Sequence, residues 1–247
     1  MDVRLGLVVA SGKIGNYEAH RAMLADLPEL SAVYCADGGV RHASRLGISP
    51  DLILGDFDSA DSAQLAEYQT AGIPFERYPT DKDYTDTELA VERAVRAGCG
   101  AILLFGALGA RIDHTLANMQ LLYKYALRGV RIALADGYGA ASVLLPGSAL
   151  RIDKYRPAAS LLGYLTYAPA GPATPAAPAA PVFANPKLSI LPVGGAAYGV
   201  TTSGLLYALI GAVLDAGYTS GVSNEFTGPE ASVELTGGAL YIMICDD

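Results

Sequence analysis

Two aspartates that lie two residues apart, Asp56 and Asp58, follow a short apolar run in this 247-residue sequence. The run, Leu52 to Leu54, is bounded by turn residues and predicts a buried strand that ends at Gly55. If the chain stays extended after this glycine, both carboxylates point the same way, because strand side chains repeat every second residue. Two like charges side by side favour a cation between them, usually a divalent metal ion. The alternative is that both aspartates only solvate a loop or cap the next helix.

Polar motifs follow three other predicted strands in the same way. They are Asp37-Gly38-Gly39, the group Asp81, Asp83 and Asp86, and the pair Arg111 and Asp113. The turns that follow predicted helices carry glycines instead, and no acid occurs in them before Asp51. In a parallel sheet the ligand lies beyond the carboxyl ends of the strands. This asymmetry favours a metal–phosphate site over simple solvation of the surface.

Strands and helices alternate through the first half of the chain, which predicts a doubly wound, mostly parallel sheet. The predicted strands are 4–10, 32–36, 52–54, 74–78, 101–105 and 130–135, and the predicted helices are 17–27, 40–46, 61–71, 85–97 and 113–128. Thr85 and Glu88 have the spacing of a capping box. Within the last helix, Leu116, Met119 and Leu122 have core spacing.

The second half has a different pattern. After Gly137 helical periodicity mostly disappears and short apolar runs alternate with Gly, Pro and Thr, which predicts a small β-sandwich. We therefore expect an α/β domain over 1–137 and a β-sandwich domain over 138–247. The segment of about 156–186 contains a run rich in proline and alanine, 168–181, that lacks charge and periodicity. This composition predicts an extended, mobile insertion on the sandwich.

Composition limits the class of protein. Half of the residues are hydrophobic, which indicates a globular chain, and the formal charge of −8 argues against general nucleic-acid binding. Three cysteines far apart fit free thiols. The N-terminus lacks the features of a signal peptide, and no apolar stretch reaches about 18 residues, the length of a membrane helix. These features predict a soluble cytoplasmic protein without membrane partners.

The motifs together resemble the thiamine pyrophosphokinase (thiamine diphosphokinase) family. The resemblance covers nearly the whole chain apart from the insertion, and its six motifs occur in the family's order. They are Cys35–Gly39, Pro50–Ser59, Tyr78–Asp86, Gly106–His114 with Asn118, Gly199–Tyr207 and Gly221–Phe226.

The resemblance implies an enzyme that transfers a pyrophosphoryl group from ATP to the hydroxyl of thiamine, with Mg²⁺, giving thiamine diphosphate and AMP. It also implies a homodimer with thiamine at the subunit interface. The predicted strand edge supports this chemistry, because phosphoryl-type transfer needs positioning and charge neutralisation more than a covalent nucleophile.

Site residues follow from the edge motifs and from the resemblance. The expected metal ligands are Asp56, Asp58, Asp81 and Asp83, and the expected catalytic residues are Asp56, Asp58, Asp81, Arg111 and Asp113. The expected ATP-binding residues are Asp37, Gly38, Gly39, Thr80, Lys82, Asp86 and Arg111, and the expected thiamine-binding residues are Thr202, Tyr207, Ser223 and Asn224. Magnesium usually takes one or two carboxylates, so not all of these acids can ligate it.

Several assignments stay open at this point. Lys82 either contacts phosphate or pairs with the aspartates around it, and Ser223-Asn224 is either a thiamine contact or a turn between strands. His20 and His42 are expected at the surface, and His114 in a structural role. The alternatives to the main function are a pyrophosphokinase for another hydroxymethyl heterocycle, such as a pterin, and an inactive sensor of nucleotide or thiamine.

Overall fold

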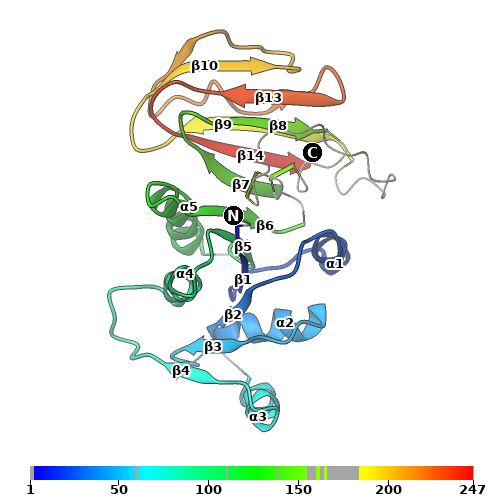
Figure 1. Cartoon of the computed structure of the whole chain (residues 1–247), viewed down its shortest axis with the longest axis vertical. Coiled ribbons are helices and arrows are strands. Elements are labelled where there is room, and N and C mark those ends of the chain that lie inside the picture. Colours follow the sequence, from blue (N-terminus) through cyan, green and yellow to red (C-terminus); the bar gives the residue numbers. More distant parts are fainter. Residues whose placement is uncertain are drawn as a thin grey trace. The chain divides into compact units, whose positions relative to one another are not determined.

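Six strands of the first half form a parallel sheet in the computed structural model (Figure 1). The strands are β1 (Leu5–Val9), β2 (Ala32–Ala36), β3 (Leu52–Gly55), β4 (Phe75–Arg77), β5 (Ala101–Phe105) and β6 (Arg131–Ala135), paired in the order β6-β5-β1-β2-β3-β4. Every residue of β1, β3 and β5 is buried. Continuous apolar strands are typical of a sheet with helices on both faces.

The structure describes residues 3–58, 61–109, 111–137, 139–154, 160–161, 164–165 and 184–246. It divides the chain into two units, Met1–Gly137 and Tyr138–Asp247. The predicted proline- and alanine-rich insertion falls almost wholly outside the described residues. None of the described helices is long and apolar enough to cross a membrane.

Helices cover both faces of the first unit's sheet, with α4 and α5 on one side and α1, α2 and α3 on the other (Figure 1). They are α1 (Tyr17–Ala25), α2 (Val40–Leu46), α3 (Ser62–Thr70), α4 (Asp86–Arg96) and α5 (Ile112–Ala126), and a short 3₁₀ helix, η1 (Asp37–Gly39), precedes α2. Side-chain caps begin three of them: Asn16 on α1, Asp61 on α3 and Thr85 on α4. The Thr85 hydroxyl accepts the Glu88 N–H at 3.2 Å, as the capping-box spacing predicts.

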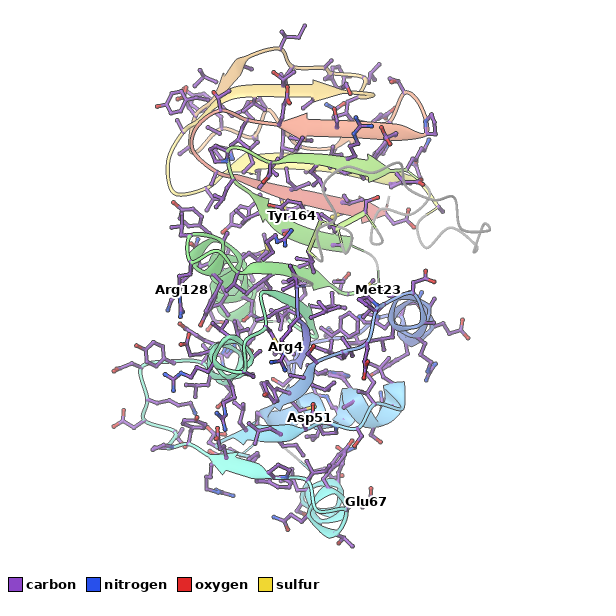
Figure 2. The ribbon with its side chains drawn as sticks, in the orientation of Figure 1. Arg4, Met23, Asp51, Glu67, Arg128 and Tyr164 are labelled. Atoms are coloured by element: carbon purple, nitrogen blue, oxygen red, sulfur yellow. The ribbon has the colours of Figure 1, made fainter. Side chains whose placement is uncertain are left out.

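Asp51, just before β3, holds two strands of the sheet together. Its carboxylate accepts the backbone N–H of Val33 at 2.8 Å, and its own N–H donates to the carbonyl of Val33 at 2.8 Å. Figure 2 shows Asp51 among the strands of the first unit. This pairing ties the start of β3 to β2.

Three burial predictions were wrong. Leu116 is 60% exposed, because the buried face of α5 follows Asn118, Leu121, Leu122 and Tyr125. His20 and His42, expected at the surface, are fully or almost fully buried. His20 lies edge-on to Phe105, with ring centroids 4.5 Å apart, and burial lowers its pKa below the usual value.

The second unit consists of two antiparallel sheets, as a sandwich requires. One pairs β12 (Asn224–Glu225), β9 (Pro186–Pro192), β14 (Leu240–Asp246) and β7 (Gly139–Leu144) in that order. The other pairs β11 (Ala212–Leu214), β10 (Ala197–Ser203), β13 (Glu230–Glu234) and β8 (Ala149–Asp153). Burial alternates along β8, β9, β13 and β14, so each sheet turns one face to the core. The predicted α/β fold followed by a β-sandwich is confirmed.

Candidate active site

A cavity of about 510 Å³ opens at the carboxyl ends of the parallel strands. The strand order reverses at β1, since β2 pairs on one side of β1 and β5 on the other. Ligands of doubly wound sheets bind at this kind of reversal. The turns after β1, β2, β3 and β5, with the first residues of α4 and α5, line the cavity. The fold therefore delivers polar residues from distant parts of the sequence to one place.

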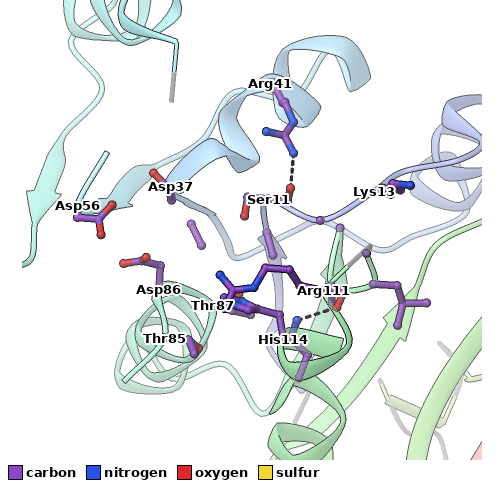
Figure 3. A pocket seen from close by; sticks show the side chains of 18 of the residues that line it. Ser11, Lys13, Asp37, Arg41, Asp56, Thr85, Asp86, Thr87, Arg111 and His114 are labelled. Carbon is purple, nitrogen blue, oxygen red and sulfur yellow. Dashed lines mark hydrogen bonds between the residues drawn. The ribbon is translucent and has the colours of Figure 1, made fainter. Parts of the chain in front are cut away.

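One side of the cavity is acidic. Asp37, Asp56 and Asp86 lie together there (Figure 3), and Asp58 also lines the cavity. The side chains of Asp56 and Asp86 are only 18% and 22% exposed. Burial raises the pKa of Asp86, and the nearby charges of Asp56 and Asp37 raise it further, while Lys82 opposes the shift. The local electrostatics therefore favour an added cation.

Lys82 already supplies part of that positive charge. Its ammonium lies 3.0 Å from the Asp86 carboxylate and 3.9 Å from that of Asp56, and it donates to the Pro79 carbonyl at 3.1 Å. Lys82 lies in the segment before α4, and Asp86 is the first residue of that helix. Of the two roles left open for Lys82, the structure shows the pairing with aspartates.

The backbone beside the acidic side adopts uncommon conformations. Asp37 and Phe57 have positive φ values of 47° and 66°, and Gly55 has φ 149°. A left-handed conformation at a residue other than glycine costs about 1–2 kcal/mol, and such residues cluster at functional sites. Phe57 also ends the extended backbone that was expected to align Asp56 with Asp58. Both carboxylates line the cavity, but the turn places them there and not strand alternation.

The donor set fits a divalent cation bound together with a polyphosphate. Among the described residues, no group of three or more His, Cys, Asp or Glu side chains could hold a metal ion by itself. Magnesium, however, usually takes one or two carboxylates and completes its shell with phosphate oxygens and water. Asp56 and Asp86 supply such carboxylates on the cavity wall.

Basic residues lie across the cavity from the acids. Lys13 and Arg41 lie on the side away from Asp37, Asp56 and Asp86 (Figure 3), and Arg111 also lines the cavity. Sequence reasoning missed Lys13 and Arg41. The signal for Lys13 was available, because Ser11-Gly12-Lys13 directly follows a strand end, as the acidic motifs do.

Arg111 and Asp113 form an exposed ion pair at the start of α5. The guanidinium donates from Nη2 to Asp113 Oδ2 at 2.6 Å and from Nε to Oδ1 at 3.2 Å. These hydrogen bonds and the Arg111 charge lower the pKa of Asp113 to about 2. Arg111 lines the cavity and Asp113 does not.

Several predicted site residues lie outside this cavity. Asp81 and Asp83 are exposed in the segment between β4 and α4. Thr80 lines a shallower hollow of about 410 Å³, which shares Asp56 and Asp58 with the main cavity. Their assignment to metal or ATP stays a prediction.

The second glycine after β2, Gly39, is required by close packing. Gly38 and Gly39 are buried in η1, and neither lines the cavity. A Cβ on Gly39 would lie 2.1 Å from the carbonyl oxygen of Val9, so this position requires glycine where η1 crosses β1.

The predicted thiamine residues lie in the second unit, where they hold a loop. The Asn224 side chain accepts the Tyr207 N–H at 3.0 Å and donates to the Tyr207 carbonyl at 2.8 Å. The buried Thr202 hydroxyl accepts the Leu209 N–H at 2.9 Å. Ser223 is exposed with φ 59°, and Tyr207 is 69% exposed. The structure thus brings Asn224 and Tyr207 together, and their contact with thiamine stays a prediction.

Comparison with known proteins agrees with this geometry. The family model "Thiamin pyrophosphokinase, catalytic domain" matches residues 27–134, and "Thiamin pyrophosphokinase, vitamin B1 binding domain" matches residues 180–240. A thiamine pyrophosphokinase of Bacillus subtilis (strain 168) is 36% identical over 101 residues, which are 41% of this chain and 47% of that protein. A thiamine pyrophosphokinase 1 of Oryza sativa subsp. japonica is 31% identical over 121 residues, or 40% and 45% of the two chains. The chain therefore spans about half the length of the curated relatives it matches.

Solved structures show the same fold over the whole chain. The crystal structure of thiamine pyrophosphokinase from Bacillus subtilis has a TM-score of 0.79 at 23% identity, covering 99% of this chain and 100% of that one. Thiamin pyrophosphokinase from Candida albicans has a TM-score of 0.71 at 16% identity, covering 99% and 90%. The two family models, matching in order and together covering more than half of the sequence, show that the chain belongs to the thiamin pyrophosphokinase family.

Proposed function

We propose that the protein transfers the pyrophosphoryl group of ATP to the hydroxyl of thiamine, giving thiamine diphosphate and AMP. The observation that carries this proposal is the cavity at the strand-order reversal, with carboxylates on one side and basic side chains on the other. Carboxylates can bind the divalent cation, and basic side chains can bind the phosphate oxygens of the polyphosphate. The relatives named as thiamine pyrophosphokinases support thiamine over a pterin as the acceptor.

The chemistry needs positioning and charge neutralisation. The hydroxyl oxygen of thiamine attacks the β-phosphorus of ATP, the bond from that phosphorus to the α–β bridging oxygen breaks, and AMP leaves. A carboxylate of the acidic side accepts the hydroxyl proton. Arg111 binds phosphate oxygens, for which its guanidinium offers bidentate hydrogen bonds.

We assign the magnesium contacts to Asp56 and Asp86 before Asp58, Asp81 and Asp83. The first two are half-buried on the cavity wall, whereas Asp81 and Asp83 are exposed outside it. When bound with ATP, Mg²⁺ neutralises charge on the phosphate oxygens. Asp37, almost fully buried in the same wall, adds to the negative potential that favours the cation.

Release of AMP with purified enzyme, ATP and Mg²⁺ tests the function. We expect thiamine-dependent AMP and none with hydroxymethylpterin. Asp56→Asn should lower kcat by about 100-fold or more with an unchanged thermal midpoint, and Asp81→Asn, the matched exposed change, should have a much smaller effect. If AMP release does not depend on thiamine, the proposed reaction is wrong. If Asp81→Asn is the more damaging change, the ligand assignment is wrong.

We further propose that the protein is a homodimer, with thiamine bound at the interface. Support comes from large apolar side chains of the second unit that are about half or more exposed: Leu206, Tyr207, Ile210, Val213, Tyr218 and Val222. We infer that these side chains form one apolar surface, and a contiguous surface of this kind marks an interaction site. Ile210, 90% exposed, is the best position for a test, because Ile210→Asp should yield monomers in analytical ultracentrifugation. A wild-type protein that is monomeric at micromolar concentration would exclude the dimer.

The three cysteines support a reducing compartment. Cys35, Cys99 and Cys245 are free thiols, and we propose a cytoplasmic location on this basis.

A further inference from the structure

The turn after β1, Ser11-Gly12-Lys13, is held by two consecutive residues of α2. The Arg41 guanidinium donates to the carbonyl of Ser11 (Figure 3). The next residue, His42, places its Nε2 atom 2.7 Å from the carbonyl oxygen of Gly12. Neighbouring side chains of one helix therefore bind neighbouring carbonyls of the turn.

The partners of His42 determine its protonation. A carbonyl oxygen only accepts hydrogen bonds, so Nε2 carries the proton and donates it to Gly12. Burial lowers the pKa of His42 to about 4, so the ring is neutral at pH 7 and Nδ1 is an acceptor. The Tyr17 hydroxyl, 2.6 Å from Nδ1, is therefore a donor. Both ring nitrogens are used, and the ring has one defined orientation between the turn and α1.

The sheet side holds the same turn through backbone hydrogen bonds. The Gly12 N–H donates to the carbonyl of Gly106 at 2.7 Å, and the Lys13 N–H donates to the carbonyl of Leu108 at 2.6 Å. A Cβ on Gly12 would lie 2.2 Å from the Leu108 carbonyl oxygen, so only glycine permits this approach. The turn is thus fixed from both sides before any ligand binds.

The side chains of this turn remain available to a ligand. Ser11 and Lys13 are exposed and line the cavity opposite the acidic side. Within the described part of the chain, the Lys13 ammonium has no ion-pair partner, in contrast to Lys82. A rigid turn that carries an unpaired cation into the cavity is suited to an anionic ligand, because little ordering is required on binding.

We propose that Ser11–Lys13 is a phosphate-contacting turn, in which Lys13 binds anionic oxygens of the nucleotide's polyphosphate and His42 is the positioning residue that holds the turn. This inference rests on the proposed use of ATP and assigns residues that the sequence motifs do not include. His42 acts through the carbonyl of Gly12 and does not touch the ligand.

Calorimetric titration of the full-length protein with ATP and with inorganic tripolyphosphate, each with Mg²⁺, tests the role of Lys13. Lys13→Met should weaken binding of both by about tenfold or more, as the loss of a charge-assisted contact predicts. Its thermal midpoint and its KM for thiamine should not change. Lys154→Met, which removes a lysine of the second unit, is the matched control and should bind both ligands as the wild type does.

A pair of His42 variants tests the positioning role. His42→Gln retains an N–H donor at about the place of Nε2, and His42→Leu does not. We expect His42→Leu to raise KM for ATP about fivefold or more with KM for thiamine unchanged, and His42→Gln to restore most of the affinity. A purely structural role would lower the thermal midpoint of both without this difference between the two substrates.

The outcomes separate this inference from the proposed function. If the wild-type protein binds tripolyphosphate but makes no thiamine-dependent AMP, the proposed reaction is wrong. The tripolyphosphate affinities of wild type and Lys13→Met then still test whether the turn binds phosphate. Unchanged ATP and tripolyphosphate affinity in Lys13→Met, or an equal loss in Lys154→Met, overturns the role of Lys13. Equal KM values for ATP in His42→Leu and wild type overturn the role of His42.

Discussion

Protonation of His42 should destabilise the first unit as the pH falls. The side chain is 4% exposed, and its pKa falls from 6.5 to about 4 in the folded protein. The unfolded chain therefore binds this proton more readily than the folded one, so stability rises with pH. The stabilisation is fully present above pH 6.5 and is lost as the pH falls towards 4.

The magnitude follows from the two pKa values. At pH 5 the imidazole is mostly protonated in the unfolded chain and mostly neutral in the folded protein. With about 1.4 kcal/mol for each pKa unit, the free energy of unfolding should fall by about 2 kcal/mol between pH 7 and pH 5 through His42. In His42→Gln the loss over this range should be smaller by the same amount, because glutamine does not titrate.

Urea unfolding at pH 7, 6 and 5, without nucleotide or Mg²⁺, measures this difference. Helices α1 to α5 all lie in the first unit, so circular dichroism at 222 nm follows mainly that unit. Other titrating groups, including the buried His20, are common to both proteins and cancel in the comparison. Equal losses in wild type and His42→Gln would refute the buried neutral histidine and the tautomer inferred from it.

Further changes to the first unit test its packing and ion pairs. Gly39→Ala should lower the free energy of unfolding by about 3 kcal/mol or more, because the new Cβ would lie 2.1 Å from a carbonyl oxygen of β1. The control Gly129→Ala, at a position with φ 77° and open space, should lower it by only about 1 kcal/mol. Equal losses in urea unfolding would contradict this packing. Asn118→Leu removes a buried donor 2.7 Å from a loop carbonyl and should cost about 1–3 kcal/mol, and a neutral effect would show that the carbonyl finds another donor. The pKa of Glu92 is lowered to about 2, mainly by Arg128, so the pair adds stability that is present above pH 4.5 and is lost as the pH falls towards 2. Because the pair is partly exposed, Glu92→Gln should lower the free energy of unfolding by no more than about 1 kcal/mol at pH 7. A larger loss in thermal unfolding would contradict this.

Local patterns were sufficient for the order of the elements and for naming the acids of the acidic side. Short runs bounded by turn residues predicted the six parallel strands, and Thr85 with Glu88 predicted the start of α4. Both signals depend on near neighbours in the sequence. The position of Asp37 and Asp56 after strand ends was also readable, since parallel strands bring their carboxyl ends to one edge.

Contacts between distant segments decided the rest. His42 looked like a surface residue of a short helix, and only the approach of the β1 turn and Tyr17 shows that it is buried and bridging. Lys13 had no motif of its own. The direction of Asp58 depends on the turn after β3, where Phe57 has a positive φ. Phenylalanine rarely adopts this conformation, so the sequence does not indicate it.

The sequence by itself determined a parallel α/β unit with acids at its strand ends, followed by a β-sandwich, and its motifs carried the resemblance to the family. Only the tertiary structure decided which acids face the cavity, that Lys82 pairs with two of them, and that Lys13 and Arg41 lie opposite. Propensity, periodicity and capping act over a few residues, so a sequence reveals them. The direction of a side chain into a site depends on turn conformations and on packing between segments far apart in the chain, which become defined only when the sheet assembles.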